Sequence, residues 1–171
     1  MRTLLLLRHA KSAWDAAGLA DHERPLNKRG VRDAPVMGSY IAAQELRPDL
    51  VLCSDAVRAR ATLTLVLQAL GAPSPAVRYE PRLYLAEPAA IVEVVSRIDP
   101  AVRRCLVVGH NPGMHALALG LVGEGDRRDI SALAMKYPTA GLAVIDFDEL
   151  AWNELKPGTG RLRAFVSPKL L

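Results

Sequence analysis

The sequence predicts an α/β fold, a three-layer sandwich in which helices cover both faces of a mostly parallel central sheet. Three observations lead to this prediction. Short apolar runs stop at a charged or polar residue, as buried strands do. Longer segments between them have the composition of helices. The two kinds of segment alternate along the chain, which is typical of a parallel sheet connected by crossover helices.

The predicted strands are short, almost uninterrupted apolar runs. In chain order they cover Thr3 to Leu7, Leu50 to Cys53, Arg104 to Val108, Ala140 to Phe147 and Leu162 to Val166. A polar turn, Lys156 to Gly160, lies between the last two runs. Runs of this length, bounded by charged residues, Gly or Pro, indicate strands rather than helices.

The predicted helices fill the segments between these strands. In chain order they cover Gly30 to Leu46, Asp55 to Leu70, Pro88 to Ile98 and a fourth segment that opens at Asn111-Pro112. The first approximates one apolar face, provided that Pro35 lies in the first turn. The second is rich in Ala and Leu, has no internal Gly or Pro, and is ended by Gly71 and Pro73. In the fourth, Asn111 is the expected cap and Pro112 the first helical residue.

Length and composition indicate a single domain over residues 1–171. Half of the residues are hydrophobic, and no repeat, low-complexity tract or linker interrupts the chain. The net charge of +4 suits acidic ligands such as phosphates, whereas nucleic-acid binding usually shows a dense basic stripe. The N-terminal apolar run is too short for a secretory signal, and no segment approaches membrane-spanning length. We therefore expect a cytoplasmic monomer that binds neither nucleic acid nor membranes, with Cys53 and Cys105 as buried, reduced thiols.

Three polar clusters directly follow predicted strands. Arg8-His9 follows the first strand, Ser54 to Arg58 the second, and Gly109 to Gly113 the third. In open α/β sheets, ligands bind beyond the carboxyl ends of the strands, so clusters far apart in sequence are expected to converge. An Arg-His pair after a strand is by itself usually no more than the end of that strand. Three such clusters at equivalent positions indicate one site.

The converging residues are suited to a phosphoryl group. Arg8 and Arg58 would face the same pocket, where two like charges are costly unless an anion lies between them, and their planar guanidiniums match phosphate oxygens. Arg58 also lies in the first turn of its helix, where free backbone N–H groups favour anions. The arginines disfavour a protonated imidazole, so His9 would be neutral and able to attack phosphorus. Arg8, Arg58 and His110 would bind the phosphoryl oxygens as their charge redistributes.

The residues around these clusters form motifs that span nearly the whole chain. They are Leu6-Leu7-Arg8-His9-Ala10-Lys11-Ser12, Asp21-x-x-Arg24-Pro25-Leu26-Asn27-x-Arg29-Gly30, Arg58-Ala59-x-x-Thr62, Leu83-Tyr84, Gly109-His110-Asn111-Pro112, Pro138-Thr139 and Ser167-Pro168-Lys169. Together they resemble the histidine phosphatase superfamily, and most closely its short SixA-type branch, the phosphohistidine phosphatases.

The resemblance carries expectations about the fold and the site. It implies a phosphoglycerate mutase-like fold, with His9 as the phosphorylated nucleophile and with Arg8, Arg58 and His110 completing the phosphate pocket. It adds Arg24 as a further phosphate-binding arginine. It implies neither a metal nor an organic cofactor, because the arginines neutralise the charge that a metal would otherwise neutralise.

Two departures from the superfamily's pattern affect the expected chemistry. Ala10 stands where the best-known signature, Arg-His-Gly, has its Gly, an exchange common in this branch. Larger members also carry an acidic residue that protonates the leaving oxygen. Glu80 and Glu87 are the candidates here and Asp21 is a third, although each is equally well explained as a surface carboxylate. A missing acid would impair the cleavage of poor leaving groups such as sugar alcohols more than the cleavage of the labile P–N bond of phosphohistidine.

These observations predict a phosphohistidine protein phosphatase that works through a covalent phosphohistidine intermediate on His9. Its expected partner is a phosphorylated protein, bound through its phosphohistidine, or a small phosphorylated substrate. The alternatives are a phosphatase for small phosphoesters or nucleotides and a non-catalytic phosphate-binding module, which would need the arginines but not His9. No motif explains the loops Ala13 to Glu23 and Gly123 to Lys136, so we expect them to shape specificity. His115 either lines the pocket or packs within the fold, and His22 is expected to be solvated.

Overall fold

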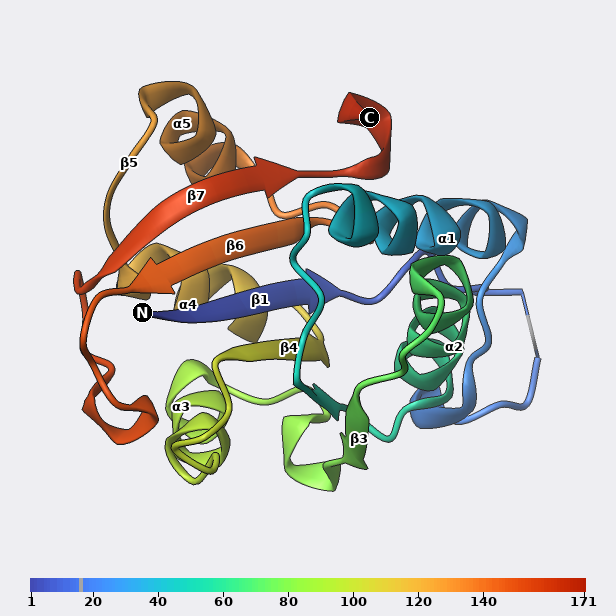
Figure 1. Ribbon diagram of the computed structural model, residues 1–171. Coiled ribbons are helices and arrows are strands. Elements are labelled where there is room, and N and C mark those ends of the chain that lie inside the picture. Colours follow the sequence, from blue (N-terminus) through green and yellow to red (C-terminus); the bar gives the residue numbers. More distant parts are fainter. Residues whose placement is uncertain (16) are drawn as a thin grey trace.

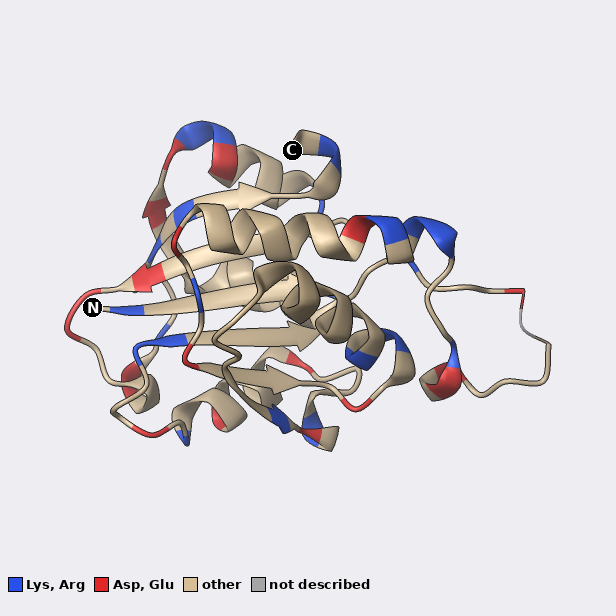
Figure 2. Cartoon of the chain, turned by 45° about the vertical axis from the view of Figure 1, so that its right-hand side comes forward, with Lys and Arg blue, Asp and Glu red and all other residues tan. Residues whose placement is uncertain are grey.

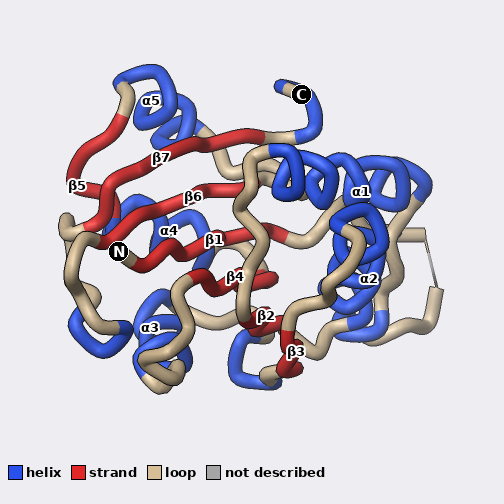
Figure 3. Tube along the Cα trace, viewed as in Figure 1, coloured by secondary structure: helices blue, strands red, loops and turns tan. Residues whose placement is uncertain are grey.

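A single sheet forms the centre of the molecule (Figures 1 and 3). The computed structural model describes residues 1–15 and 17–171. In this part of the chain seven strands pair in the order β3-β2-β4-β1-β6-β7-β5. Their bounds are β1 (Arg2–Arg8), β2 (Leu50–Cys53), β3 (Ala76–Tyr79), β4 (Arg104–Gly109), β5 (Val122–Gly125), β6 (Leu142–Phe147) and β7 (Gly160–Val166). β6 runs antiparallel to β1 and β7, and the other pairs are parallel, so the mostly parallel sheet is confirmed.

Helices cover both faces of the sheet, which confirms the three layers. Their bounds are α1 (Lys28–Ala43), α2 (Val57–Leu70), α3 (Pro88–Ser96), α4 (Gly113–Leu121) and α5 (Arg127–Met135). One hydrophobic core lies between the sheet and α1 with α2, and a second lies between the sheet and α3, α4 and α5. Figure 2 shows that the middle parts of β1, β2 and β4 carry no charged residues, whereas β7 near the edge of the sheet carries Arg161 and Arg163 within the strand.

The first strand shows why its sequence is apolar without alternation. Side chains of a strand point alternately to the two faces of the sheet. Leu5 and Leu7 accordingly enter the core under α1 and α2, whereas Leu4 and Leu6 enter the opposite core. Both faces are covered, so every position must be apolar.

The structure corrects the predicted start of three helices, of which α2 begins at Val57 rather than Asp55. α1 begins at Lys28 rather than Gly30, with the Asn27 side chain accepting a hydrogen bond from the Gly30 N–H, so Pro35 lies about two turns inside the helix and not in its first turn. The helix continues through Pro35 because the buried face on either side of it packs into the core. α4 begins at Gly113, and Asn111 does not cap it: its Oδ1 accepts no hydrogen bond, while its Nδ2 donates to the Tyr137 carbonyl.

Three elements have no counterpart in the predicted set. β3 is an edge strand with exposed side chains, so it lacks the apolar run by which the other strands were found. The segment Gly123 to Lys136, expected to be a loop, contains most of β5 and all of α5. Asp126 caps α5 by accepting a hydrogen bond from the Arg128 N–H, a signal that is present in the sequence. No helix in the described ranges is long and apolar enough to cross a membrane.

The close approach of α1 and α2 fixes the position of the α2 N-terminus. At Gly38 in α1, a Cβ atom would lie 2.2 Å from the carbonyl oxygen of Val66 in α2. Backbone therefore meets backbone at this crossing, and no side chain can move aside to make room. The contact anchors α2, whose first turn carries Arg58.

Gly38→Ala should therefore destabilise the fold. We expect the free energy of unfolding to fall by about 1–3 kcal/mol, because the added methyl group meets the Val66 carbonyl. The matched control is Gly120→Ala on α4, where an added Cβ would have no neighbour within 4 Å. This substitution should raise the free energy of unfolding by about 0.5–1 kcal/mol. Urea denaturation measures both, and equal effects of the two substitutions would contradict the close packing.

Candidate active site

The three polar clusters meet at the carboxyl ends of neighbouring strands. In the parallel pair of β1 with β4, Arg8 pairs with Gly109, so His9 and His110 follow at adjacent positions. The His9 N–H donates to the Gly109 carbonyl at 3.0 Å, and the two imidazole centroids lie 5.1 Å apart. Beyond β2, the Ser54 N–H donates to the Val108 carbonyl at 3.0 Å. The predicted convergence is thus present in the structure.

A pocket of about 280 Å³ opens over these strand ends. All five residues predicted for the phosphate site line it: Arg8, His9, Arg24, Arg58 and His110. Its other lining residues are Lys11, Ser12, Trp14, Asp21, Leu85, Asn111 and Thr139. Lys11, Ser12 and Thr139 belong to the motifs quoted above, although the sequence assigned them no role. Leu85 follows the Leu83-Tyr84 motif, and Trp14 lies two residues after the first motif.

Hydrogen bonds define the tautomer of His9. Its Nδ1 lies 2.7 Å from the Ala10 carbonyl oxygen, which can only accept, so Nδ1 carries the proton. Nε2 consequently carries the electron pair, and it accepts a long hydrogen bond from Arg58 Nε, with 3.4 Å between the two nitrogens. Burial, together with the charges of Arg58, Arg8 and Arg24, lowers the pKa of His9 to about 4, although the bond to Ala10 works in the opposite direction. At neutral pH the side chain is a neutral imidazole with an available nucleophilic nitrogen.

His110 is held in a similar state by different contacts. Its Nε2 lies 2.7 Å from Ser54 Oγ, which also accepts a hydrogen bond from the Ala56 N–H. Burial and the neighbouring His9 and Arg58 lower the pKa of His110 to about 3. Ser54 thereby fixes the ring orientation of the second histidine, a role that the sequence did not assign to it.

Arg58 is buried in the first turn of α2, as predicted, and two residues fix it there. Its Nη1 donates to the Asp21 carbonyl oxygen at 2.7 Å, and its Nη2 lies 3.0 Å from Asp21 Oδ2. One turn along the helix, Thr62 Oγ donates to the Arg58 carbonyl and accepts from the Ala10 N–H. Thr62 therefore ties α2 to the chain that directly follows His9.

Arg24 and Arg8 enter the pocket from other segments. Arg24 Nη1 donates to Ser12 Oγ at 2.7 Å, and its Nε donates to Asp21 Oδ1 at 3.1 Å. Arg8 Nη1 donates to the Tyr137 carbonyl at 2.9 Å. The pocket therefore gathers three guanidiniums, each oriented by hydrogen bonds to the protein, around the imidazole of His9.

Unpaired buried polar atoms concentrate at this pocket. Among the described residues, the buried side-chain nitrogens and oxygens without a hydrogen-bond partner are Arg2 Nε, Arg8 Nε, His110 Nδ1 and Asn111 Oδ1. Three of these four atoms belong to residues that line the pocket. A buried polar atom without a partner is costly, and such atoms are rare in folded proteins. Their concentration here is typical of a site whose remaining partners come from a ligand.

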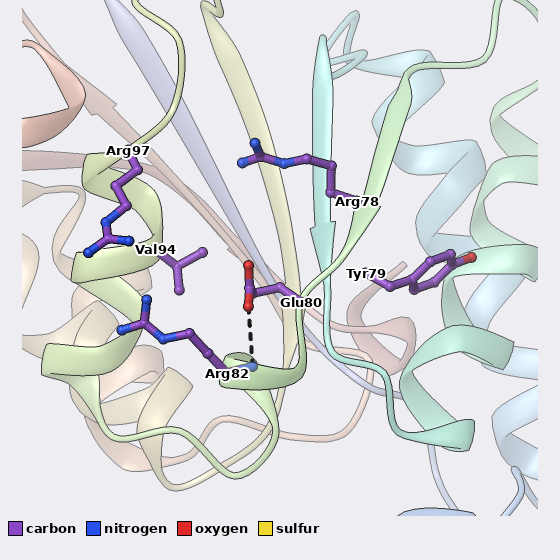
Figure 4. Close-up of a pocket in the computed structure, with 6 residues that line it drawn as sticks. All are labelled: Arg78, Tyr79, Glu80, Arg82, Val94 and Arg97. Carbon is purple, nitrogen blue, oxygen red and sulfur yellow. Dashed lines mark hydrogen bonds between the residues drawn. The ribbon is translucent and has the colours of Figure 1, made fainter.

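The structure places the two preferred acid candidates outside this pocket. Glu80 lies in a separate, open hollow, where it accepts a hydrogen bond from the Arg82 N–H at 3.4 Å (Figure 4). Glu87 is exposed at the start of α3. The third candidate, Asp21, does line the pocket. Hydrogen bonds from Tyr84, Arg58 and Arg24 hold the pKa of its carboxyl well below the usual range, so it is ionised at neutral pH and has no proton to give.

The remaining predicted residues lie away from the reacting atoms. His115 Nε2 donates to the Leu133 carbonyl, so this histidine packs α4 against α5. His22 Nε2 lies 2.8 Å from Asp55 Oδ1, and the His22 ring contacts the Tyr84 ring, so this side chain is not free in solvent. Cys53 and Cys105 are buried free thiols, as expected, and burial raises the pKa of both to about 12. Within the described residues, no group of three or more His, Cys, Asp or Glu is placed to hold a metal ion.

The two depressed histidine pKa values predict how stability depends on pH. In the unfolded chain, imidazoles bind protons near pH 6.5, whereas in the folded chain His9 and His110 remain neutral until about pH 4 and about pH 3. The unfolded state therefore binds more protons in this window, and the free energy of unfolding should fall as the pH drops from 6.5 toward 3. Chemical denaturation at a series of pH values measures this fall, and the variant His9→Gln/His110→Gln should show a shallower one. Histidine NMR signals from these two residues that titrate near pH 6.5 would contradict the assignment.

Comparisons with known proteins agree with this geometry. The family model of the histidine phosphatase superfamily (branch 1) matches residues 4–84. An uncharacterised protein of Mycobacterium tuberculosis is 40% identical over 165 residues, which cover 95% of this chain and 100% of the relative. The crystal structure of a SixA protein from Agrobacterium tumefaciens has 32% identity and a TM-score of 0.81, with 98% of each chain covered. The structure of a protein histidine phosphatase SixA complexed with tungstate has 26% identity and a TM-score of 0.73, with 98% of this chain and 97% of that chain covered. The chain belongs to the histidine phosphatase superfamily, in its SixA-type branch.

Proposed function

We propose that this protein is a phosphohistidine phosphatase that works through a covalent phosphohistidine intermediate on His9. The observation that carries the proposal is the state of His9. The ring is buried and neutral, its Nδ1–H is bonded to the Ala10 carbonyl, and Nε2 lies within a group of guanidiniums. A site that only binds phosphate would need the arginines but would have no use for this nitrogen.

In the first step, His9 Nε2 attacks phosphorus in line with the bond to the leaving group. The P–Nε2 bond forms, the bond from phosphorus to the substrate nitrogen breaks, and the electron pair and a solvent proton go to that nitrogen. Arg8, Arg58 and His110 bind the three equatorial oxygens, where charge is redistributed in the transition state. The Ala10 carbonyl stabilises the positive charge that develops on the imidazole of His9, because it accepts the Nδ1–H.

In the second step, water attacks phosphorus and the P–Nε2 bond breaks. His9 has kept its Nδ1 proton throughout, so it leaves as a neutral imidazole. This departure requires no general acid. The products are inorganic phosphate and the starting enzyme.

Two observations support phosphohistidine as the substrate. The pocket carboxylate, Asp21, is ionised, and Glu80 and Glu87 lie elsewhere, so a poor leaving group such as a sugar alkoxide would receive no proton. A P–N bond needs less assistance. In addition, the structures most similar over the full chain include SixA proteins, one of which was solved with tungstate, a tetrahedral oxyanion like phosphate.

The covalent step predicts a labelled enzyme. Brief incubation with a radiolabelled phosphohistidine protein, followed by an alkaline detergent quench, should leave a base-stable, acid-labile phosphate on the wild-type chain. His9→Asn should carry no label and should lose activity by about a thousandfold or more, since removing a nucleophile eliminates the pathway. His115→Gln, which changes a histidine outside the pocket, is the matched control and should be labelled normally.

A label that persists on His9→Asn would show that another residue is the nucleophile. Faster turnover of small phosphoesters than of phosphohistidine protein would favour the alternative substrate class.

Arg58→Ala should separate catalysis from folding. We expect kcat/KM to fall by about 10²–10³, the usual effect of removing one donor to a transition-state oxygen. The free energy of unfolding should change by about 1 kcal/mol or less, because a buried charge is removed and Asp21, which is partly exposed, keeps Arg24 as a partner. Arg97→Ala, in the separate hollow of Figure 4, is the control for removal of an arginine. A loss of stability several times larger would show that Arg58 is mainly structural.

A further inference from the structure

The pocket is larger than a phosphoryl group requires. Its volume is about 280 Å³, and a water molecule in the liquid occupies about 30 Å³, so there is room for roughly nine. A phosphoryl group has four heavy atoms and fills less than half of this space. The remainder must receive the part of the substrate that departs, and the side chains that line it select that leaving group.

Trp14 is one of two exposed apolar side chains at this pocket. It lies in the loop after β1, and 74% of the surface of Trp14 is exposed. Residue 16 of the same loop lies outside the described residues. One face of the indole is covered, because the Arg24 guanidinium lies 3.6 Å from the ring centroid. This cation–π contact orients the ring against a residue of the phosphate site. Much of the indole is thus held at the pocket and remains open to a partner.

Leu85 is the second such side chain, and its backbone is unusual. It is 52% exposed and has a φ of +48°, in the left-handed region that favours glycine. An L-residue there costs about 1–2 kcal/mol, and an exposed leucine recovers little of this by burial. Strain of this kind tends to occur at functional sites. The segment that carries Leu85 is joined to the site through Tyr84, whose ring contacts His110 and whose hydroxyl donates to Asp21.

We propose that Trp14 and Leu85 bind a flat, aromatic ring to which the phosphoryl group is attached. The substrate class is then a phosphorylated aromatic or heteroaromatic ring, such as the phosphoimidazole of phosphohistidine or an aryl phosphate. The indole offers a stacking face and the leucine an aliphatic contact, and neither satisfies the hydroxyl groups of a sugar. This inference deepens the proposed function and rests on it for the identity of the reacting group.

Binding of two phosphonates tests the ring site without turnover, because their C–P bond is not hydrolysed. Phenylphosphonate and methylphosphonate carry the same anionic group and differ only in the ring. We expect titration calorimetry to show that wild type binds phenylphosphonate about tenfold more tightly, in line with a ring contact of about 1.4 kcal/mol. Leu85→Gly and Trp14→Ala should each reduce this preference to about threefold or less. Leu85→Gly suits its left-handed backbone, so it should fold normally.

Leu119→Ala is the matched control, because Leu119 is an exposed leucine that does not line the pocket, and it should keep the full preference. Equal binding of the two phosphonates by wild type overturns the proposal, as does a preference that survives in either pocket variant. Loss of affinity for both phosphonates alike in Trp14→Ala would mean that Trp14 acts only through Arg24, which also overturns it. The relative turnover of phosphoimidazole and 1-naphthyl phosphate then shows whether the preferred substrate is a phosphorylated imidazole or an aryl phosphate. A ring preference without a phosphoenzyme on His9 would instead refute the proposed function alone.

Discussion

The buried positive charge of Arg58 is the constraint around which the active site is organised. Only 3% of its side-chain surface is exposed, and a charge removed from water must be compensated by partners nearby. Asp21 supplies both a carboxylate and a carbonyl oxygen to it. The same carboxylate binds Arg24, so one acidic residue compensates two of the three guanidiniums. Together with the hydrogen bond from the Tyr84 hydroxyl, these contacts lower the pKa of Asp21 and keep it ionised, so this carboxylate cannot serve as the acid of the pocket.

The same charge also contributes to the neutral state of the two histidines. Burial disfavours a protonated imidazole at His9 and His110, and Arg58 adds to the effect at both. The two rings receive their orientation from different partners, a backbone carbonyl in one case and the Ser54 hydroxyl in the other. The register of β1 against β4 places them side by side, so the geometry depends on strand pairing rather than on flexible loops. The groups that we propose as nucleophile and phosphate ligands are therefore fixed before substrate arrives, which favours catalysis.

The parts of the site that the sequence predicts are those determined by the sheet. Arg8, His9, Arg58 and His110 follow buried strands or begin a helix, and the rule that ligands bind beyond strand ends places such residues together. The apolar runs were visible because both faces of the sheet are covered. β3 was missed because an exposed edge strand has no such run. Asp21 could be proposed only as one of three possible acids, because its ion pairs join a loop to a distant helix and depend on the tertiary fold.

Among the described residues the pocket holds no carboxylic acid with a proton to give, and this observation and the tautomer of His9 support the same proposal about the substrate. An enzyme that cannot protonate its leaving group is restricted to groups that leave readily, in both halves of the reaction. In the second half the leaving group is His9 itself, and the Ala10 carbonyl ensures that it departs as neutral imidazole because Nδ1 keeps its proton. By symmetry, the leaving group best matched to the first half is another imidazole. The first step then transfers phosphorus from one imidazole nitrogen to another, so it has no large difference in bond strength to overcome, and the second step passes the phosphoryl group to water.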